Sequence, residues 1–202
     1  MTPDALAQAI RAKAAGEGRF VTALAGPPGA GKSTLAETLR ATLGAGARIV
    51  PMDGFHLDNA VLDARGLRPR KGAPETFDAD GFLHLMHRLR QGGDVAIPVF
   101  DRGMDLARAA ADIVTDADRF LIVEGNYLLL DEAPWPALAP FFDLTVCIDV
   151  PEAELERRLI RRWLDHGLAP DAARARALSN DIPNARRVLA RSRPAQIVLR
   201  QS

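Results

Sequence analysis

Near its start the chain reads Gly26-Pro27-Pro28-Gly29-Ala30-Gly31-Lys32-Ser33, which follows the pattern G-x-x-x-x-G-K-[ST]. The preceding residues, 20–25, are apolar and of buried-strand type, and the following residues, 34–40, have the composition of a helix. Glycines let successive backbone N–H groups turn toward one anion, and the start of the helix adds its positive end. In this setting the octapeptide predicts a binding site for the phosphates of a nucleoside triphosphate.

The pattern also assigns a task to individual residues of the loop. Lys32 would place a positive charge on the β- and γ-phosphates, and the hydroxyl of Ser33 would reach Mg²⁺. We expect the nucleotide to be bound by Gly26, Gly29, Ala30, Gly31, Lys32, Ser33 and Thr34.

Composition narrows the class of protein. The chain has 202 residues, 48% of them hydrophobic, and a formal net charge of zero. One domain spanning residues 1–202 is expected at this length. The sequence has no basic stripe that would indicate nucleic acid as a partner. It also has no segment with the pattern of a signal peptide or a membrane span. The single cysteine, Cys147, lies in an apolar run and is expected to be a buried core residue, which agrees with a cytoplasmic protein.

Apolar segments alternate with helical ones along the chain. Strands are expected at 20–25, 48–52, 95–100, 120–123, 142–150 and 197–199, with a short extra strand at 112–115. Helices are expected from residue 2, at 34–40, 78–90, 151–164 and 170–178, and from 184. Because the strands are apolar throughout, both faces of the sheet should be covered. The expected fold is α/β: a three-layer αβα sandwich with a mostly parallel sheet.

Acidic residues follow several of the predicted strands. Asp53, Asp101 and Glu124 each lie at a strand's carboxyl end, where open α/β sheets bind ligands. Phosphoryl transfer needs an acid that holds metal and a base near the acceptor hydroxyl. Asp53 could serve as the base or reach Mg²⁺, and Glu124 is suited to be the second metal acid.

Two further segments carry polar side chains toward the same edge. Four arginines, Arg157, Arg158, Arg161 and Arg162, lie on one predicted helix. They are suited to phosphate oxygens and could close over the triphosphate as a lid at about residues 155–180, although a solvated helix face is the alternative. Residues 54–77 form a long segment with little periodicity, which is typical of a functional loop. Within it His56, close to Asp53, could contact substrate.

Four blocks then point to a family. They are Asp53-Gly54-Phe55, Arg70-Lys71-Gly72-Ala73-Pro74-Glu75-Thr76-Phe77-Asp78, Pro98-Val99-Phe100-Asp101-Arg102 and Val123-Glu124-Gly125. Their order and spacing over residues 20–199 resemble the phosphoribulokinase, uridine kinase and bacterial pantothenate kinase group of P-loop kinases. The likeness is greatest to a bacterial branch labelled fructose transport system kinase.

The resemblance implies roles for individual residues. Asp53 would be the base, and Ser33, Glu124 and Asp53 would hold Mg²⁺. The lid arginine would be Arg161 or Arg162, acting with Lys32. The acceptor would be bound by His56, Arg70, Lys71, Glu75, Asp101 and Arg102. Asn184 and Arg186 are candidates for contacts with the adenine ring of ATP.

The expected function is transfer of the γ-phosphoryl group of ATP to a hydroxyl of a small molecule. Where uridine kinases have a tyrosine and a base-recognising histidine, this chain has Phe100 and the sequence Gly103-Met104-Asp105. Both differences speak against a nucleoside, and an aromatic content of 5% leaves few residues on which a base could stack. The sequence therefore favours a sugar-like acceptor, with fructose as one candidate. A nucleoside or pantothenate-type acceptor stays open, as does a non-kinase P-loop ATPase or regulatory switch. The oligomeric state is also open, with a homodimer as one option.

Overall fold

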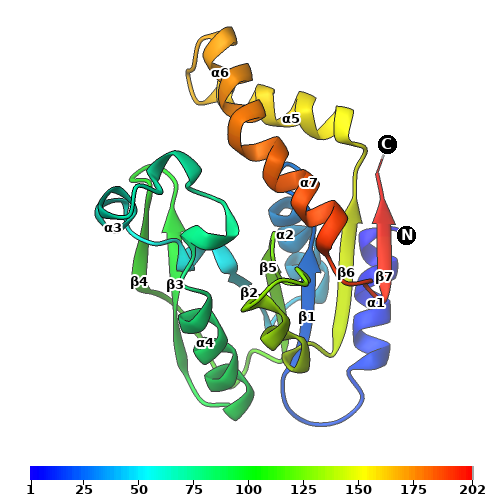
Figure 1. Cartoon of the computed structure of the whole chain (residues 1–202). Helices are drawn as coiled ribbons and strands as arrows, with labels where there is room; N and C mark the ends of the chain where they lie inside the picture. The colour runs from blue at the N-terminus through cyan, green and yellow to red at the C-terminus, as the bar shows by residue number, and fades with distance from the viewer. Residues whose placement is uncertain (202) are drawn as a thin grey trace.

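The structure is a computed structural model and describes residues 1–201. Five parallel strands form the central sheet in the order β2-β5-β1-β6-β7 (Figure 1). They are β1 (Phe20–Ala25), β2 (Ala47–Pro51), β5 (Phe120–Gly125), β6 (Leu144–Asp149) and β7 (Ile197–Arg200). The strand that leads into the glycine-rich loop, β1, pairs with both β5 and β6 and so lies at the centre of the sheet.

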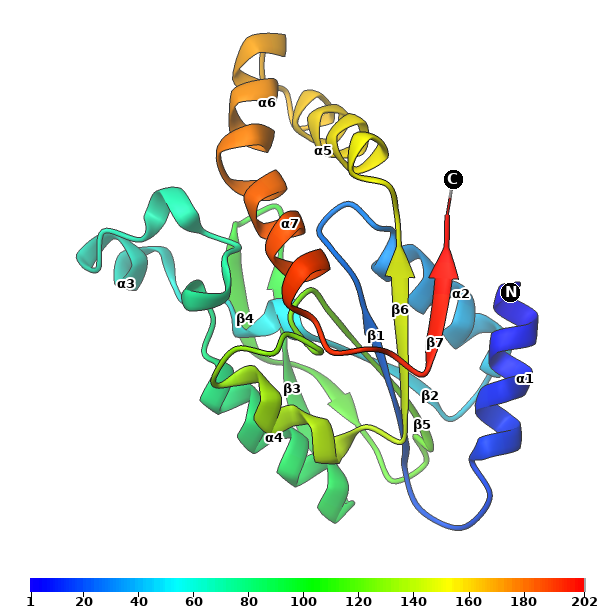
Figure 2. The same cartoon turned by 45° about the vertical axis from the view of Figure 1, so that its right-hand side comes forward.

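Both faces of the sheet are covered, as expected. Successive side chains of a strand point to opposite faces, and in β1 Val21, Ala23 and Ala25 belong to one hydrophobic cluster while Leu24 belongs to the other. Helices α1 (Pro3–Lys13) and α2 (Lys32–Leu43) cover one face, and α4 (Ala79–Gln91) and the 3₁₀ helix η4 (Trp135–Phe141) cover the other. The predicted three-layer αβα sandwich is confirmed (Figure 2).

Three helices rise above the carboxyl ends of the strands in Figures 1 and 2. They are α5 (Glu152–Asp165), α6 (Pro170–Arg176) and α7 (Ile182–Arg191), and a π-helical turn, η5 (Ala177–Asp181), joins the last two. Their residues include the segment 155–180 for which we expected a lid. Buried Leu155 and Leu159 anchor α5 to the body of the protein.

One part of the predicted sheet is wrong. Residues 95–100 do not join the parallel sheet, because β3 (Val95–Asp101) pairs antiparallel with β4 (Leu106–Val114) in a separate two-stranded sheet. Four residues connect the two strands, which suffices for a hairpin but not for a parallel crossover. The short strand expected at 112–115 is the end of β4. Pro98 lies where the pairing register shifts between Ile97 and Val99, a position that tolerates proline.

The segment 54–77 is more ordered than its lack of periodicity suggested. After β2 the chain forms η1 (Met52–Phe55), α3 (Asn59–Ala64), η2 (Arg68–Arg70) and η3 (Pro74–Thr76). Ala73 and Phe77 are buried, and a backbone bridge joins Phe77 to His56. We call residues 54–77 the substrate loop.

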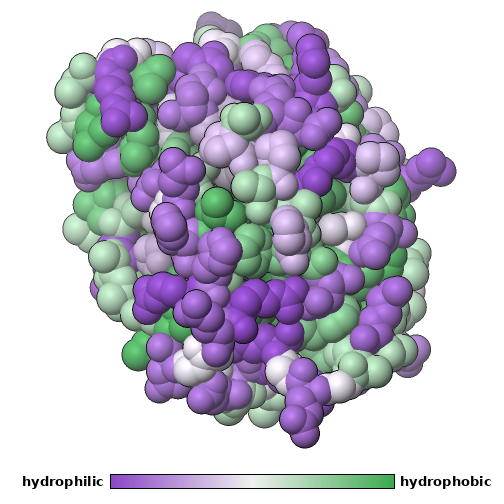
Figure 3. Space-filling view, turned by 60° about the horizontal axis from the view of Figure 1, so that its bottom comes forward, coloured by the Kyte–Doolittle hydropathy of each residue, from purple (hydrophilic) through white to green (hydrophobic). Residues whose placement is uncertain are grey.

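Figure 3 shows the molecule with the amino ends of the strands brought forward. Hydrophilic residues cover much of this face, and hydrophobic residues lie between them in small groups. Among residues 1–201, no helix is both long and apolar enough to cross a membrane.

Candidate active site

The glycine-rich loop has the backbone shape that its sequence predicts. Gly29 and Gly31 have φ values of 82° and 84°, which are strained for any residue with a Cβ. Helix α2 begins directly after, at Lys32, so its first N–H groups face the same space as the loop. The loop and the helix together form a cradle for anionic oxygen atoms.

Lys32 is held inside this cradle. Its side chain is almost fully buried, and its Nζ donates to Pro27 O at 3.0 Å and to Asn126 Oδ1 at 2.5 Å. Burial lowers the pKa of Lys32, while the charges of Glu124 and Asp53 act in the opposite direction. The ammonium group therefore lies among oxygens that a phosphate could replace.

Ser33 and Glu124 meet beside Lys32. The Ser33 hydroxyl donates to Glu124 Oε1 at 3.3 Å, and burial raises the pKa of Glu124 although Lys32 opposes this. Among the described residues, no group of three or more His, Cys, Asp or Glu side chains is arranged to hold a metal. This donor set still fits Mg²⁺, which is usually held by one or two carboxylates together with phosphates and water.

Asp53 lies on η1, directly after β2. Arg102 Nη2 donates to Asp53 Oδ2 at 3.2 Å. The next residue must be glycine, because a Cβ at Gly54 would lie 2.4 Å from the carbonyl oxygen of Pro98. This close approach of η1 to β3 brings Arg102, at the end of the hairpin strand, within reach of Asp53.

Three cavities meet at Asp53. One, of about 330 Å³, lies between α2, β2 and the β3–β4 hairpin. The two others adjoin the glycine-rich loop. Of these two, the first, of about 410 Å³, is lined by the glycine-rich loop, Lys32, Ser33, Glu124 and Arg158, and we call it the phosphate cavity. The second, of about 380 Å³, lies between the substrate loop, the β3–β4 turn and helices α5 to α7, and we call it the acceptor cavity. Residues that line both are Pro28, Asp53, Arg102, Asn126 and Arg162.

His56 lies on the wall of the acceptor cavity between two aromatic rings. The centroid of its ring is 4.1 Å from that of Phe77 and 4.6 Å from that of Phe100, and its Nδ1 lies 2.8 Å from Asp53 O. Burial lowers the pKa of His56, although Asp53 acts in the opposite direction. Burial therefore favours the neutral form of this imidazole.

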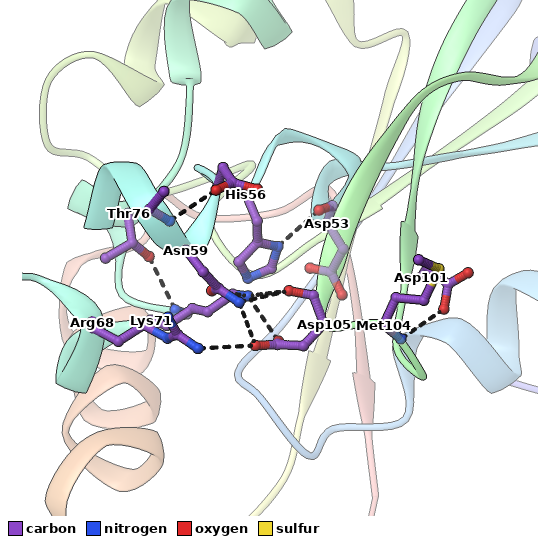
Figure 4. Close-up of polar contacts among 12 residues, drawn as sticks. Asp53, His56, Asn59, Arg68, Lys71, Thr76, Asp101, Met104 and Asp105 are labelled. Carbon is purple, nitrogen blue, oxygen red and sulfur yellow. Dashed lines mark hydrogen bonds and ion pairs between the residues drawn. The ribbon is translucent and has the colours of Figure 1, made fainter. Parts of the chain in front are cut away.

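Lys71 joins the substrate loop to the turn between β3 and β4 (Figure 4). Its Nζ lies 2.7 Å from both Asn59 Oδ1 and Asp105 Oδ1, and 5.0 Å from the centre of the Phe100 ring. The Lys71 side chain is 10% exposed and lines the acceptor cavity. Asp105 has a positive φ of 53°, which aspartate tolerates better than most residues.

The two arginines named as candidates for the lid role are separated by the structure. Arg162 lines both cavities. Burial lowers the pKa of Arg162, and the positive charge of Arg102 lowers it further. Arg161 lines neither cavity: its side chain is 72% exposed and pairs with Asp165 at 2.9 Å. Arg158 lines the phosphate cavity while pairing with Glu154 at 2.6 Å. Geometry thus favours Arg162, with Arg158 beside it.

Three other candidates have different partners. Arg70 pairs with Glu75 at 2.6 Å, and Glu75 also pairs with Arg187 at 3.2 Å, so this group ties the substrate loop to α7. Asp101 accepts from Met104 N at 3.0 Å and stabilises the hairpin turn (Figure 4). Arg70, Glu75 and Asp101 line neither cavity, in contrast to His56, Lys71 and Arg102.

Several cavity residues were not among the candidates. Asn126 touches Lys32 and lines both cavities, and its place just beyond Glu124 was the available signal. Others that line the acceptor cavity are Pro28, Arg68, Gly72, Phe100, Asp105, Trp163, Arg176 and Asp181. Of the two adenine candidates, Asn184 also lies in the acceptor cavity, whereas Arg186 is exposed and pairs with Glu152 at 2.6 Å. Neither lines the phosphate cavity.

A parallel sheet with a glycine-rich loop, a buried lysine and an acid on the adjacent strand defines the class of P-loop NTPases. Within that class, the chain belongs to the Phosphoribulokinase / Uridine kinase family, whose model matches residues 21–186. Members of this family transfer phosphate to hydroxyl groups, use ATP and typically need Mg²⁺, so the chain is a phosphotransferase that acts on a small molecule.

The chain is also similar to individual members of known sequence or structure. The chain is 41% identical to the uncharacterized protein YggC of Escherichia coli K12, over 90% of this chain and 77% of YggC. It is 32% identical to the pantothenate kinase of Parvibaculum lavamentivorans, over 72% of this chain but 48% of that enzyme. A crystal structure from Silicibacter sp. TM1040, provisionally described as a fructose transport system kinase, is 50% identical and superposes with a TM-score of 0.94 over 98% of both chains.

Proposed function

We propose that the protein transfers the γ-phosphoryl group of ATP to a hydroxyl of a small, polar, sugar-like acceptor, with fructose as one candidate. The observation that carries the proposal is the wall shared by the two cavities. Asp53, Asn126 and Arg162 face a space suited to phosphates on one side and a space lined by hydrogen-bonding groups on the other. A hydroxyl in the acceptor cavity and a phosphate in the phosphate cavity can therefore meet at Asp53.

On the phosphate side, backbone N–H groups of residues 26–34 would hold the phosphates, and Lys32 would exchange its contact with Asn126 for phosphate oxygens. Arg162, and beside it Arg158, would balance the charge that develops on the transferred group. Ser33, Glu124 and Asp53 are the residues that would hold Mg²⁺, which neutralises phosphate charge and orients the phosphates when bound.

Asp53 is the residue placed to act as the base. The Asp53 carboxylate would accept the proton of the acceptor hydroxyl while that oxygen forms its bond to the γ-phosphorus. The bond from the γ-phosphorus to its bridging oxygen breaks at the same centre, and ADP leaves with the electron pair. Because Arg102 donates to Asp53 Oδ2, the other carboxylate oxygen stays available to the acceptor hydroxyl.

The lining of the acceptor cavity supports a polar acceptor. Charged and amide side chains dominate it, and His56 adds an imidazole. Phe100 and Trp163 add aromatic rings to the wall of the cavity. The fructose candidate is supported by the description of the 50% identical Silicibacter protein. The single cysteine and the use of ATP support a cytoplasmic location.

The test is ATP consumption by the purified protein with Mg²⁺ across fructose and other sugars, nucleosides and pantothenate. The proposal expects turnover that depends on a sugar-like acceptor and a product that carries one new phosphate, detected by mass spectrometry. Turnover with a nucleoside or with pantothenate would replace the acceptor class. ATP hydrolysis that no acceptor accelerates would instead favour an ATPase or regulatory switch.

A further inference from the structure

Asn126 lies where the phosphate cavity and the acceptor cavity adjoin, and its side chain lines both of them. Its carbonyl oxygen, Oδ1, accepts a hydrogen bond from Lys32 Nζ at 2.5 Å. Within residues 1–201 its amide nitrogen, Nδ2, forms no hydrogen bond. The side chain is thus held through one atom only, on the side of the glycine-rich loop.

The backbone on both sides of Asn126 is fixed, so a movement at this position is a movement of the side chain. The preceding Gly125 packs so closely that a Cβ there would lie 2.5 Å from Met52 Cβ. The following Tyr127 is fully buried, and its hydroxyl donates to Gly72 O at 2.5 Å. Asn126 itself is only partly buried. A rotation of its side chain carries the amide from one cavity toward the other.

Binding of phosphates removes the partner of this amide. A lysine ammonium has three donors, and Lys32 uses two of them, toward Pro27 O at 3.0 Å and toward Asn126 Oδ1. Contacts to one β- and one γ-phosphate oxygen need two donors, so one of the present contacts must break. Pro27 O belongs to the backbone of the loop and also accepts from Ala30 N at 3.1 Å. The contact with the Asn126 side chain is therefore the one that breaks.

We propose that Asn126 binds a hydroxyl group of the acceptor, and that it does so only after the phosphates of ATP have displaced it from Lys32. Its amide then offers the acceptor cavity an oxygen and two N–H donors, which match a hydroxyl because a hydroxyl both donates and accepts. The inference rests on the proposed kinase function. It adds to that function a binding residue and an order of binding, with ATP before the acceptor.

Such an exchange links the binding of the two substrates. Because ATP makes the amide available, ATP raises the affinity for the acceptor, and the acceptor raises the affinity for ATP by the same factor. A simpler role for Asn126 would be to hold Lys32 in place. That role predicts weaker ATP binding when the amide is removed, and an acceptor affinity that is the same with and without nucleotide.

The first experiment needs no acceptor. A crystal structure with Mg²⁺ and the non-hydrolysable analogue AMP-PNP should show Lys32 Nζ on phosphate oxygens and the Asn126 amide turned toward the acceptor cavity. If Asn126 Oδ1 still lies within about 3.2 Å of Lys32 Nζ, the inference is overturned, whichever acceptor the enzyme uses.

The second experiment measures calorimetric binding of whichever compound the ATP assay turns over among fructose, uridine and pantothenate. For the wild type we expect an affinity about tenfold higher with AMP-PNP than with AMP, which has no β- or γ-phosphate to reach Lys32. Asn126→Ala should abolish most of this gain. Lys32→Met frees the amide, so this variant should bind the compound without nucleotide about as tightly as the wild type does with AMP-PNP.

Asn59→Ala is the matched control, because Asn59 is an amide of the substrate loop that contacts Lys71 and not Lys32. It should change the acceptor affinity by the same factor with AMP-PNP and with AMP. Asn126→Asp should hold Lys32 as an ion pair, so KM for ATP should rise and the nucleotide-dependent gain should disappear. A gain that survives Asn126→Ala, or that is missing from the wild type, would overturn the inference.

The two proposals fail in different ways. Acceptor-dependent turnover without a nucleotide-dependent gain in acceptor affinity would support the kinase assignment and refute the role of Asn126. Movement of the amide on AMP-PNP binding, without turnover of any acceptor, would refute the kinase assignment. It would also overturn the acceptor contact, because the movement would then report only the presence of nucleotide.

Discussion

The phosphate cavity and the acceptor cavity, which meet at Asp53, are built in different ways. Half of the residues that line the phosphate cavity come from one continuous stretch, residues 28–34, and the others are Asp53, Arg102, Glu124, Asn126 and two arginines of α5. The acceptor cavity is assembled from short pieces of the substrate loop, the β3–β4 turn, α5, α6, η5 and α7. The phosphates, which many proteins bind, thus lie mainly against the backbone of one loop. The acceptor, which distinguishes this kinase from others, lies against side chains that only the fold brings together.

This difference has a chemical reason. Phosphates need a concave row of N–H groups and a positive charge, which a loop and a helix start can supply from adjacent residues. A small polar acceptor has no such repeating feature, so each of its groups needs its own side chain at its own position. Substitutions should therefore affect the two substrates separately, except at the residues that line both cavities.

The largest expected effect is on the phosphate side. Lys32→Ala removes the charge that would contact the phosphates, so we expect kcat/KM for ATP to fall by about 10³-fold or more, with weaker ATP binding as well. Steady-state kinetics and calorimetric titration with ATP measure both quantities. Wild-type ATP affinity and rate in this variant would refute the phosphate-binding role of residues 26–34.

At Asp53, which lines both cavities, a substitution should change kcat without changing ATP affinity. Asp53→Asn keeps the shape of the side chain but removes the proton acceptor, so we expect kcat to fall by about 10²- to 10³-fold while ATP affinity stays nearly unchanged. The comparison requires the true acceptor at saturation. An unchanged kcat under those conditions would contradict the assignment of Asp53 as the base.

Two adjacent arginines test whether the shared wall is functional. Arg162→Gln should lower kcat by about 10- to 100-fold, because Arg162 faces both cavities, while Arg161→Gln should change it by less than about twofold. Both changes remove one positive charge from the same helix, so each controls for the other. Equal effects of the two substitutions would mean that α5 acts through its overall charge.

Much of the phosphate cavity could be predicted because its residues are neighbours in sequence. Arg162 could also have been chosen over Arg161. It follows buried Leu155 and Leu159 at the spacing i, i+4 and i+7, which places it on the inward face of the helix, and Arg161 lies off that face. The same periodicity explains why Arg158 faces the loop.

The acceptor cavity offered no such pattern. Arg70 and Lys71 are adjacent and both polar, yet only Lys71 reaches the cavity, because the turn after η2 directs one side chain inward and the other toward Glu75. Arg176 and Asp181 lie 99 and 104 residues beyond Phe77, the last residue of the substrate loop, and only the packing of α6 and η5 brings them to it. The hairpin of β3 and β4 was mistaken for part of the parallel sheet because an apolar run does not reveal its pairing partner.

The smallest expected effect concerns stability. Burial raises the pKa of Asp181, while the hydrogen bond from Trp163 and the charge of Arg162 act in the opposite direction. An acid whose pKa is raised on folding binds its proton more tightly in the folded state, so its ionisation lowers the free energy of unfolding as pH rises above its unfolded value of about 3.9.

Asp181→Asn keeps an oxygen for the Trp163 N–H and removes the charge, so the variant should be more stable than the wild type at pH 7 by about 0.5–2 kcal/mol. This advantage should shrink as pH falls toward about 4, where the wild-type carboxyl is protonated as well. Urea unfolding of both proteins at several pH values measures this difference in the free energy of unfolding. A constant difference across that range would mean that packing, and not charge, decides the stability at this position. A shrinking difference, accompanied by a loss of activity, would show that the acceptor cavity keeps a charged group at the expense of folding stability.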